Sequence, residues 1–284
     1  MSNPSYDATG TGFCRKLLAS GRVRRAAVAT FLLLAIAYLG PLFAPHEPSD
    51  IVGIPFDVAG VGVWLGTDYL GQDIFSRILC GGRSVVWMST LASLIAIVFG
   101  AALGLFAAYA GGLVDTAVGW FNDILLAFPL IVLVILFLSM LGHDPSLIVV
   151  VVAIGWLPTV TRLSRGVALS VIHQEYVAWA ELVGMPRYKI LLKEVLPNVT
   201  TPLIVQFGAL LTWSIGIIAG LSFLGFGIQP PNADWGLMVN ENRSGLMIAP
   251  WGTIAPIAMI AFFALAVNSL TDAVSDILGI GDVL

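Results

Sequence analysis

Long apolar runs separated by short polar segments dominate the chain. A helix that crosses the hydrocarbon core of a bilayer needs about 20 apolar residues. Six runs approach or exceed that length: 26–44, 85–110, 122–141, 146–161, 201–226 and 251–271. Pro129 and Pro158 predict kinks in the third and fourth runs. The pairs Gly100/Gly104 and Gly216/Gly220 predict close helix contacts. The pattern predicts an all-α polytopic membrane protein with six transmembrane helices.

The composition agrees with a membrane protein and limits the functions that the chain can have. Of the 284 residues, 58% are hydrophobic and only 11% are charged, whereas a soluble domain has about 25% charged residues. The net charge of −4 argues against a basic surface for nucleic acid. No ionisable side chain falls in the middle of a run, and Asp123 and Asp272 lie near run ends. Ion-driven transporters need buried ionisable groups. We therefore expect the energy for any activity of this protein to be supplied from outside the membrane.

Lysine and arginine set the orientation because they are enriched in cytoplasmic segments. Ten of the thirteen basic residues lie before the first run or between the fourth and fifth. Both termini and the loop 162–200 are therefore predicted in the cytoplasm, and 45–84 and 227–250 are predicted to face outward. The expected organisation is a tail at 1–25, a first transmembrane helix at 26–44, an outward segment at 45–84, a five-helix core at 85–272 and a tail at 273–284. Cys14 and Cys80 then lie on opposite sides and cannot pair.

Residues 175–197, EYVAWAELVGMPRYKILLKEVLP, are too polar for the membrane interior. Within them one apolar helix face is predicted, because four residues recur at helical spacing: Tyr176, Trp179, Ala180 and Val183. This helix should end at Val183, since Gly184 can take a left-handed cap and Pro186 cannot continue the helix.

A second short helix is expected after Pro186. Its apolar side would carry Ile190, Leu191 and Val195, and it should stop before Pro197. From the residues alone, the two helices form either a projecting knob that docks on a partner or an amphipathic loop on the membrane surface.

The same segment resembles the cytoplasmic coupling loop of ABC importer permeases. Its signature is Glu-Ala-Ala, three residues, Gly, nine residues, Ile, one residue, Leu-Pro, which places Gly184, Leu196 and Pro197 on the signature and Ala180 on its second alanine. The chain departs from the signature at Ala178, Trp179 and Glu194. The preceding Glu175-Tyr176-Val177 resembles the peptide-importer branch.

Three more segments resemble that branch in the right order: 65–83, 221–236 and 250–279. The best match is the C-type permease subunit of oligopeptide or dipeptide importers. This resemblance implies a type I ABC importer permease fold, a bacterial plasma membrane location, a second permease, two cytoplasmic ATPases and an external solute-binding protein. It also implies that the loop couples to an ATPase through these residues: Glu175, Tyr176, Ala178, Trp179, Ala180, Val183, Gly184, Leu196 and Pro197.

The chain itself carries no recognisable site for hydrolysing ATP. None of its three lysines is followed by Ser or Thr, so no phosphate-binding loop is encoded, and under the resemblance ATP and Mg²⁺ belong to the partner ATPases. No catalytic set and no metal-ligand spacing is expected. The polar residues Gln206, Thr212 and Ser214 either line the transport path or form interhelical hydrogen bonds.

Two other classes of protein remain possible. An ion-driven secondary transporter would need an intramembrane charge or an inverted repeat. An intramembrane enzyme would need a nucleophile–base or carboxylate pair at membrane depth.

Overall fold

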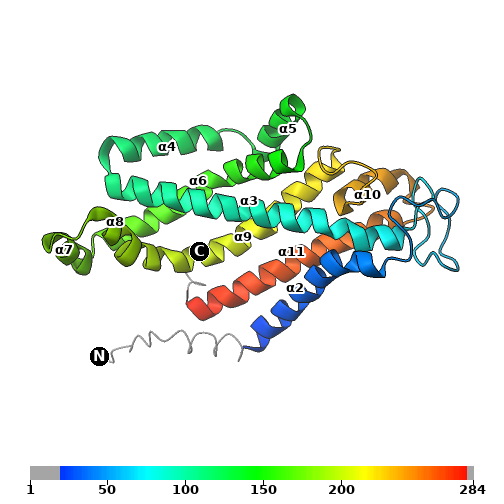
Figure 1. Cartoon of the computed structure of the whole chain (residues 1–284), viewed down its shortest axis with the longest axis horizontal. Helices are drawn as coiled ribbons and strands as arrows, with labels where there is room; N and C mark the ends of the chain where they lie inside the picture. Colours follow the sequence, from blue (N-terminus) through cyan, green and yellow to red (C-terminus); the bar gives the residue numbers. More distant parts are fainter. Residues whose placement is uncertain (1–19, 280–284) are drawn as a thin grey trace.

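The computed structural model describes residues 20–279, which form an elongated helical bundle with irregular loops at one end (Figure 1). Over this range the chain forms no β-strand, and extended segments meet only at isolated bridges such as Ile51 with Gln72. The elements are α2 (Gly21–Leu39), η1 (Gly40–Phe43), α3 (Ile74–Ala110), α4 (Gly112–Leu126), α5 (Leu130–Leu141), α6 (Pro145–Ile172), α7 (Glu175–Leu182), α8 (Arg187–Ile190), the π-helical η2 (Leu191–Val195), α9 (Leu196–Phe223), α10 (Trp235–Asn242), η3 (Arg243–Gly245) and α11 (Trp251–Leu278).

Aspartate side chains fix where three of these helices begin. Asp73 accepts hydrogen bonds from the backbone N–H groups of Phe75 and Ser76 at the start of α3. Asp144 and Asp234 cap α6 and α10 in the same way. An N-cap carboxylate satisfies N–H groups that have no partner inside the helix. The starts of α3 and α10 are therefore fixed in the loops that join them to the rest of the bundle.

Within residues 20–279, five helices are long and apolar enough to cross a membrane, and a sixth span exists if the bent pair α4–α5 is counted as one. The kink predicted at Pro129 in the run 122–141 is confirmed as a complete break, because α4 and α5 meet at an angle of 81°. Pro129 lacks an N–H group, and the residue before a proline avoids the helical conformation. The chain breaks at this point, and α5 starts anew after Pro129.

Two helices extend well beyond the apolar runs that predicted them. α3 begins at Ile74 instead of 85, so the outward segment predicted to reach residue 84 ends at Asp73. α6 continues to Ile172, so the loop predicted at 162–200 starts only at 173. The run ended at Arg162, but in the fold Arg162 is 2.6 Å from Asp123 of α4. Hydropathy marks the apolar part of a helix and does not show where the helix itself ends.

The other predicted helix boundaries differ less from those in the structure. The span predicted at 201–226 is α9, which the π-helical η2 joins to α8, and the span predicted at 251–271 extends to Leu278 in α11. The first span, predicted at 26–44, begins at Gly21. Cys14 lies outside the described residues, and Cys80 has a free thiol.

The largest helix interface joins α3 to α6, and glycine makes it possible. A Cβ atom on Gly104 would overlap Ser164 and the backbone of Thr161, and one on Gly100 would overlap Val160. The predicted close contact at Gly100/Gly104 is therefore correct. The contact predicted at Gly216/Gly220 does not form within the described chain, because no atom lies within 4 Å of a Cβ at either position.

We expect Gly104→Ala to destabilise the protein by about 1–3 kcal/mol, the usual cost of overpacking a tight interface. The matched control is Gly216→Ala, where the added methyl meets open space and the helix gains about 1 kcal/mol of propensity. Thermal unfolding in detergent measures both variants. Equal effects of the two substitutions would show that the α3–α6 crossing does not depend on its glycine.

A second core lies at the end of the bundle that carries the long loop. The indole of Trp235 is fully buried, and its Nε1 donates a hydrogen bond to the carbonyl of Ile78 at 2.9 Å. Gly81 and Gly82 leave the room that this ring occupies, since a Cβ on Gly82 would overlap it. The contact fixes α10 against the first turns of α3.

Candidate functional site

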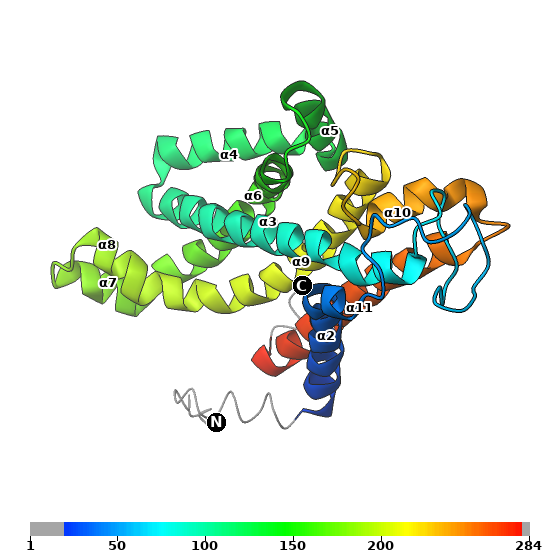
Figure 2. The same cartoon turned by 45° about the vertical axis from the view of Figure 1, so that its right-hand side comes forward.

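The segment that stood out in the sequence lies at the end of the bundle opposite the long loop. α7 projects beyond the ends of α2 and α11, as Figures 1 and 2 show. It ends as predicted: the N–H of Gly184 donates to the carbonyl of Glu181, and the N–H of Met185 donates to that of Ala180. Gly184 has φ +78°, so this is a Schellman motif with glycine in the left-handed position.

The segment after the glycine differs from the prediction. The second helix was expected to stop before Pro197, but α8, η2 and α9 form one helical stretch from Tyr188 to Phe223. The π-helical turn at Leu191–Val195 precedes Pro197 and accommodates a residue without an N–H group. Leu196 is half-buried and Pro197 exposed, and both belong to a continuous helix instead of ending a short one.

Three contacts attach α7 to the bundle. The side chain of Val177 is buried, and Ala180 packs against the same core. The hydroxyl of Tyr109, near the end of α3, donates to a carboxylate oxygen of Glu181 at 3.1 Å. The amide of Asn198 on α9 donates to the Tyr176 hydroxyl at 3.3 Å. α7 is thus joined to two membrane helices, through the partner residues Tyr109 and Asn198, which the sequence pattern did not single out.

The opposite side of α7 is apolar and exposed. The exposed fractions are 43% for Tyr176, 67% for Trp179, 80% for Leu182 and 77% for Val183. We call these four residues the tip surface. The predicted face contained Ala180 in place of Leu182, which is wrong because Ala180 turns toward the core with Val177. Glu175 and Ala178 are exposed beside the tip surface.

A buried charge cluster holds the other end of the molecule together. Arg77, 2% exposed, forms ion pairs with Asp68 in the long loop and with Glu241 on α10, the latter at 2.8 Å. Tyr69 donates its hydroxyl to Glu241 at 3.2 Å, and its backbone N–H donates to the Asn242 side chain. Burial raises the pKa of the Glu241 carboxyl above its ordinary value, against the opposing charge of Arg77.

The aspartates of this end have structural roles. Asp73 caps α3, and Asp68 accepts from the N–H groups of Leu70 and Gln72 as well as pairing with Arg77. Asp234 accepts from the Ser84 hydroxyl at 2.5 Å, and its complete burial raises its pKa. The long loop, α3 and α10 therefore form one polar, hydrogen-bonded unit.

The three polar residues predicted in the fifth span do not form a cluster. The Ser93 hydroxyl of α3 donates to Ser214 of α9 at 3.1 Å, and both side chains are fully buried. Thr212 donates to the carbonyl of Gly208 within its own helix, and Gln206 is half-buried. The geometry at Ser214 is that of an interhelical hydrogen bond.

Comparison with solved structures gives the class of this fold. The chain is similar to a chain of the MetNI methionine ABC transporter in an inward-facing conformation, with a TM-score of 0.55 and 14% identity over 70% of this chain and 96% of that one. The fold is that of an ABC importer permease, a multi-pass membrane protein.

Sequence comparison gives the family. Residues 100–279 match the family described as binding-protein-dependent transport system inner membrane component, and the chain belongs to it. The glutathione transport system permease protein GsiD of Pectobacterium atrosepticum is 36% identical over 94% of this chain and 89% of its own length. The dipeptide transport system permease protein DppC of Alkalihalophilus pseudofirmus is 34% identical over 88% and 82%. The predicted family is confirmed, and the protein is a permease subunit of an ABC importer.

Proposed function

We propose that this permease imports short peptides, including di- and oligopeptides, across a bacterial plasma membrane. The support comes from relatives whose names specify glutathione and dipeptide transport. The proposed assembly contains a second permease, two cytoplasmic ATPases that bind ATP and Mg²⁺, and an external solute-binding protein that delivers the peptide. In this assembly the chain hydrolyses no ATP, since it encodes no phosphate-binding loop.

The tip surface is the observation that carries the coupling role. An exposed apolar patch on a short, firmly attached helix is the kind of element that fits a groove on a partner. In the proposed mechanism one ATPase holds α7 through Trp179, Leu182 and Val183. Closure of the ATPase pair on ATP then moves α7, and the helices joined to it turn the pathway outward.

The orientation follows from the positive-inside rule. The end of the bundle that bears α7 also bears the start of α2, with Arg22, Arg24 and Arg25. We therefore assign α7 and both termini to the cytoplasm, and the loop 44–73 with α10 to the outer side. The charge cluster around Arg77 then stabilises the surface that receives the solute-binding protein.

Gly184→Val is the sharpest test of the coupling role. No other atom lies within 4 Å of a Cβ at this position, so the substitution acts only through the backbone. A β-branched residue at positive φ costs about 1–3 kcal/mol, which would distort the end of α7. We expect dipeptide uptake by the reconstituted complex to fall at least tenfold while ATP hydrolysis persists.

The matched control is Gly184→Asn, because asparagine tolerates the left-handed conformation. It should retain most of the uptake. Normal uptake by the valine variant would refute the role of this corner in coupling.

A further inference from the structure

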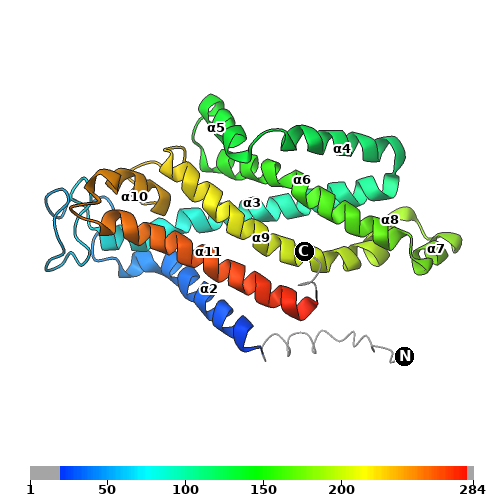
Figure 3. The same cartoon turned by 180° about the vertical axis from the view of Figure 1, so that it is seen from behind.

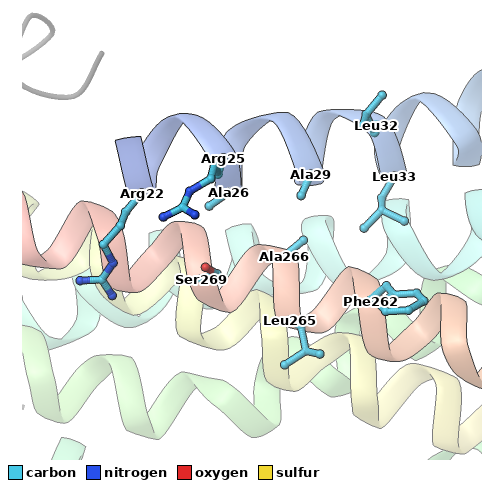
Figure 4. A pocket seen from close by; sticks show the side chains of 10 residues that line it. All are labelled: Arg22, Arg25, Ala26, Ala29, Leu32, Leu33, Phe262, Leu265, Ala266 and Ser269. Carbon is cyan, nitrogen blue, oxygen red and sulfur yellow. The ribbon is translucent and has the colours of Figure 1, made fainter. Parts of the chain in front are cut away.

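A groove between α2 and α11 has no role in the coupling mechanism. The two helices lie side by side (Figure 3) and line an open groove of about 750 Å³ between them. Small side chains create it, since Ala26 and Ala29 of α2 line it together with Ala266 of α11. Figure 4 shows these residues along the space between the two ribbons.

One end of the groove is positively charged. Arg22 and Arg25, one turn apart on α2, both line it, and Ser269 of α11 lies beside them (Figure 4). Arg25 has no carboxylate partner among the described residues, and its Nε donates only to the carbonyl of Gly21. Arg22 pairs with Asp276 at 2.8 Å, but both side chains are more than half exposed. A solvated pair of this kind contributes little, so both guanidinium groups are available to an anion.

The rest of the groove is apolar and open along its side. Leu32, Phe262 and Leu265 line it and are 56%, 59% and 64% exposed. From Arg22 to Leu33 the helix rises about 16 Å at 1.5 Å per residue. Half of a bilayer's hydrocarbon core is about 15 Å thick. The groove therefore extends from the charged interface to roughly the middle of the membrane.

We infer that this groove binds an anionic phospholipid, with its phosphate at Arg22 and Arg25 and an acyl chain along Ala29, Leu33 and Ala266. Basic pockets between membrane helices on the cytoplasmic side suit anionic headgroups, and the open apolar side admits a chain from the bilayer. A free phosphate would use only the arginines. The leaflet rests on the orientation proposed above, but binding measured in detergent does not.

Native mass spectrometry of the full chain tests this assignment with added phosphatidylglycerol or phosphatidylethanolamine of identical acyl chains. Phosphatidylglycerol should be retained at least tenfold more than phosphatidylethanolamine. The double variant Arg22→Gln/Arg25→Gln should lose that preference. Arg24→Gln is the control, because it removes one positive charge from the same turn but Arg24 does not line the groove. Its retention should stay within twofold of the parent.

Two further variants separate a lipid from other occupants. Ala29→Phe fills the apolar part and should lower phosphatidylglycerol retention without touching the arginines. Asp276→Asn removes the carboxylate that competes for Arg22 and should raise retention. A photocrosslinker in place of Leu265 should capture lipid in native membranes.

Four results would overturn the assignment. They are equal retention of both lipids, an Arg24→Gln loss as large as that of the double variant, displacement by inorganic phosphate with no effect of Ala29→Phe, or a crosslink from position 265 to protein. None of these depends on the ATPase, so failure here leaves the coupling mechanism untouched, and failure of coupling leaves the lipid result standing.

Discussion

Substituting Trp179→Ala and Leu182→Ser together is expected to lower peptide uptake by the assembled complex at least tenfold. The two side chains are 67% and 80% exposed in the isolated chain, so their truncation removes little packing. Central aromatic residues of an interface are often worth 2 kcal/mol or more, and about 1.4 kcal/mol is a tenfold change in affinity. We expect the ATPase to co-purify in much lower yield with the variant permease.

Leu113→Ser provides the matched control for this experiment. Leu113 is 88% exposed and begins α4 at the same end of the bundle, outside the tip surface. It should leave uptake and ATPase yield within twofold of the parent. If both variants bind the ATPase as the parent does, α7 is not the element that the ATPase holds.

Arg77→Met should destabilise the end of the protein that carries the loop 44–73 by about 3–5 kcal/mol, the cost of breaking a buried ion pair from one side. It leaves Asp68 fully buried and Glu241 nearly so, with no cation between them. We expect a large fall in thermal unfolding temperature in detergent. Adding Asp68→Asn and Glu241→Gln to Arg77→Met should recover part of the loss, because the stranded charges are then gone.

Arg83→Gln is the control on the same helix. Arg83 is exposed and forms no ion pair in the described part of the chain, so the change should stay within about 0.5 kcal/mol. A similar small effect of Arg77→Met would mean that the cluster does not hold the loop, α3 and α10 together.

The features that the sequence predicted well depend on neighbouring residues. The end of α7 is predicted by Gly184 and Pro186 alone. The structure has the hydrogen bonds of a Schellman motif at this glycine. Apolar runs located the membrane helices because a span needs a continuous apolar length, although α3 and α6 extend well beyond their runs. The coupling segment was found for the same reason, as a polar stretch between two apolar ones.

The features that the sequence did not predict depend on residues far apart in the chain. Arg77 is buried in the first turn of α3 and pairs with Glu241 of α10, and nothing near Arg77 in the sequence indicates that partner. Trp235 likewise fits over Gly82. On α7, periodicity grouped Ala180 with Tyr176, but the core that Val177 and Ala180 join is built by other helices. Only the fold could decide which side of that short helix stays exposed.

The unbroken helix from Tyr188 to Phe223 has a mechanical consequence. It is about 54 Å long at 1.5 Å per residue, and it starts next to α7 and ends near the outer loops. A stiff rod of that length swings one end by about 9 Å for a tilt of roughly 10° about the other. In the proposed mechanism, a tilt imposed at the end next to α7 is carried along this one helical stretch to the opposite end of the bundle.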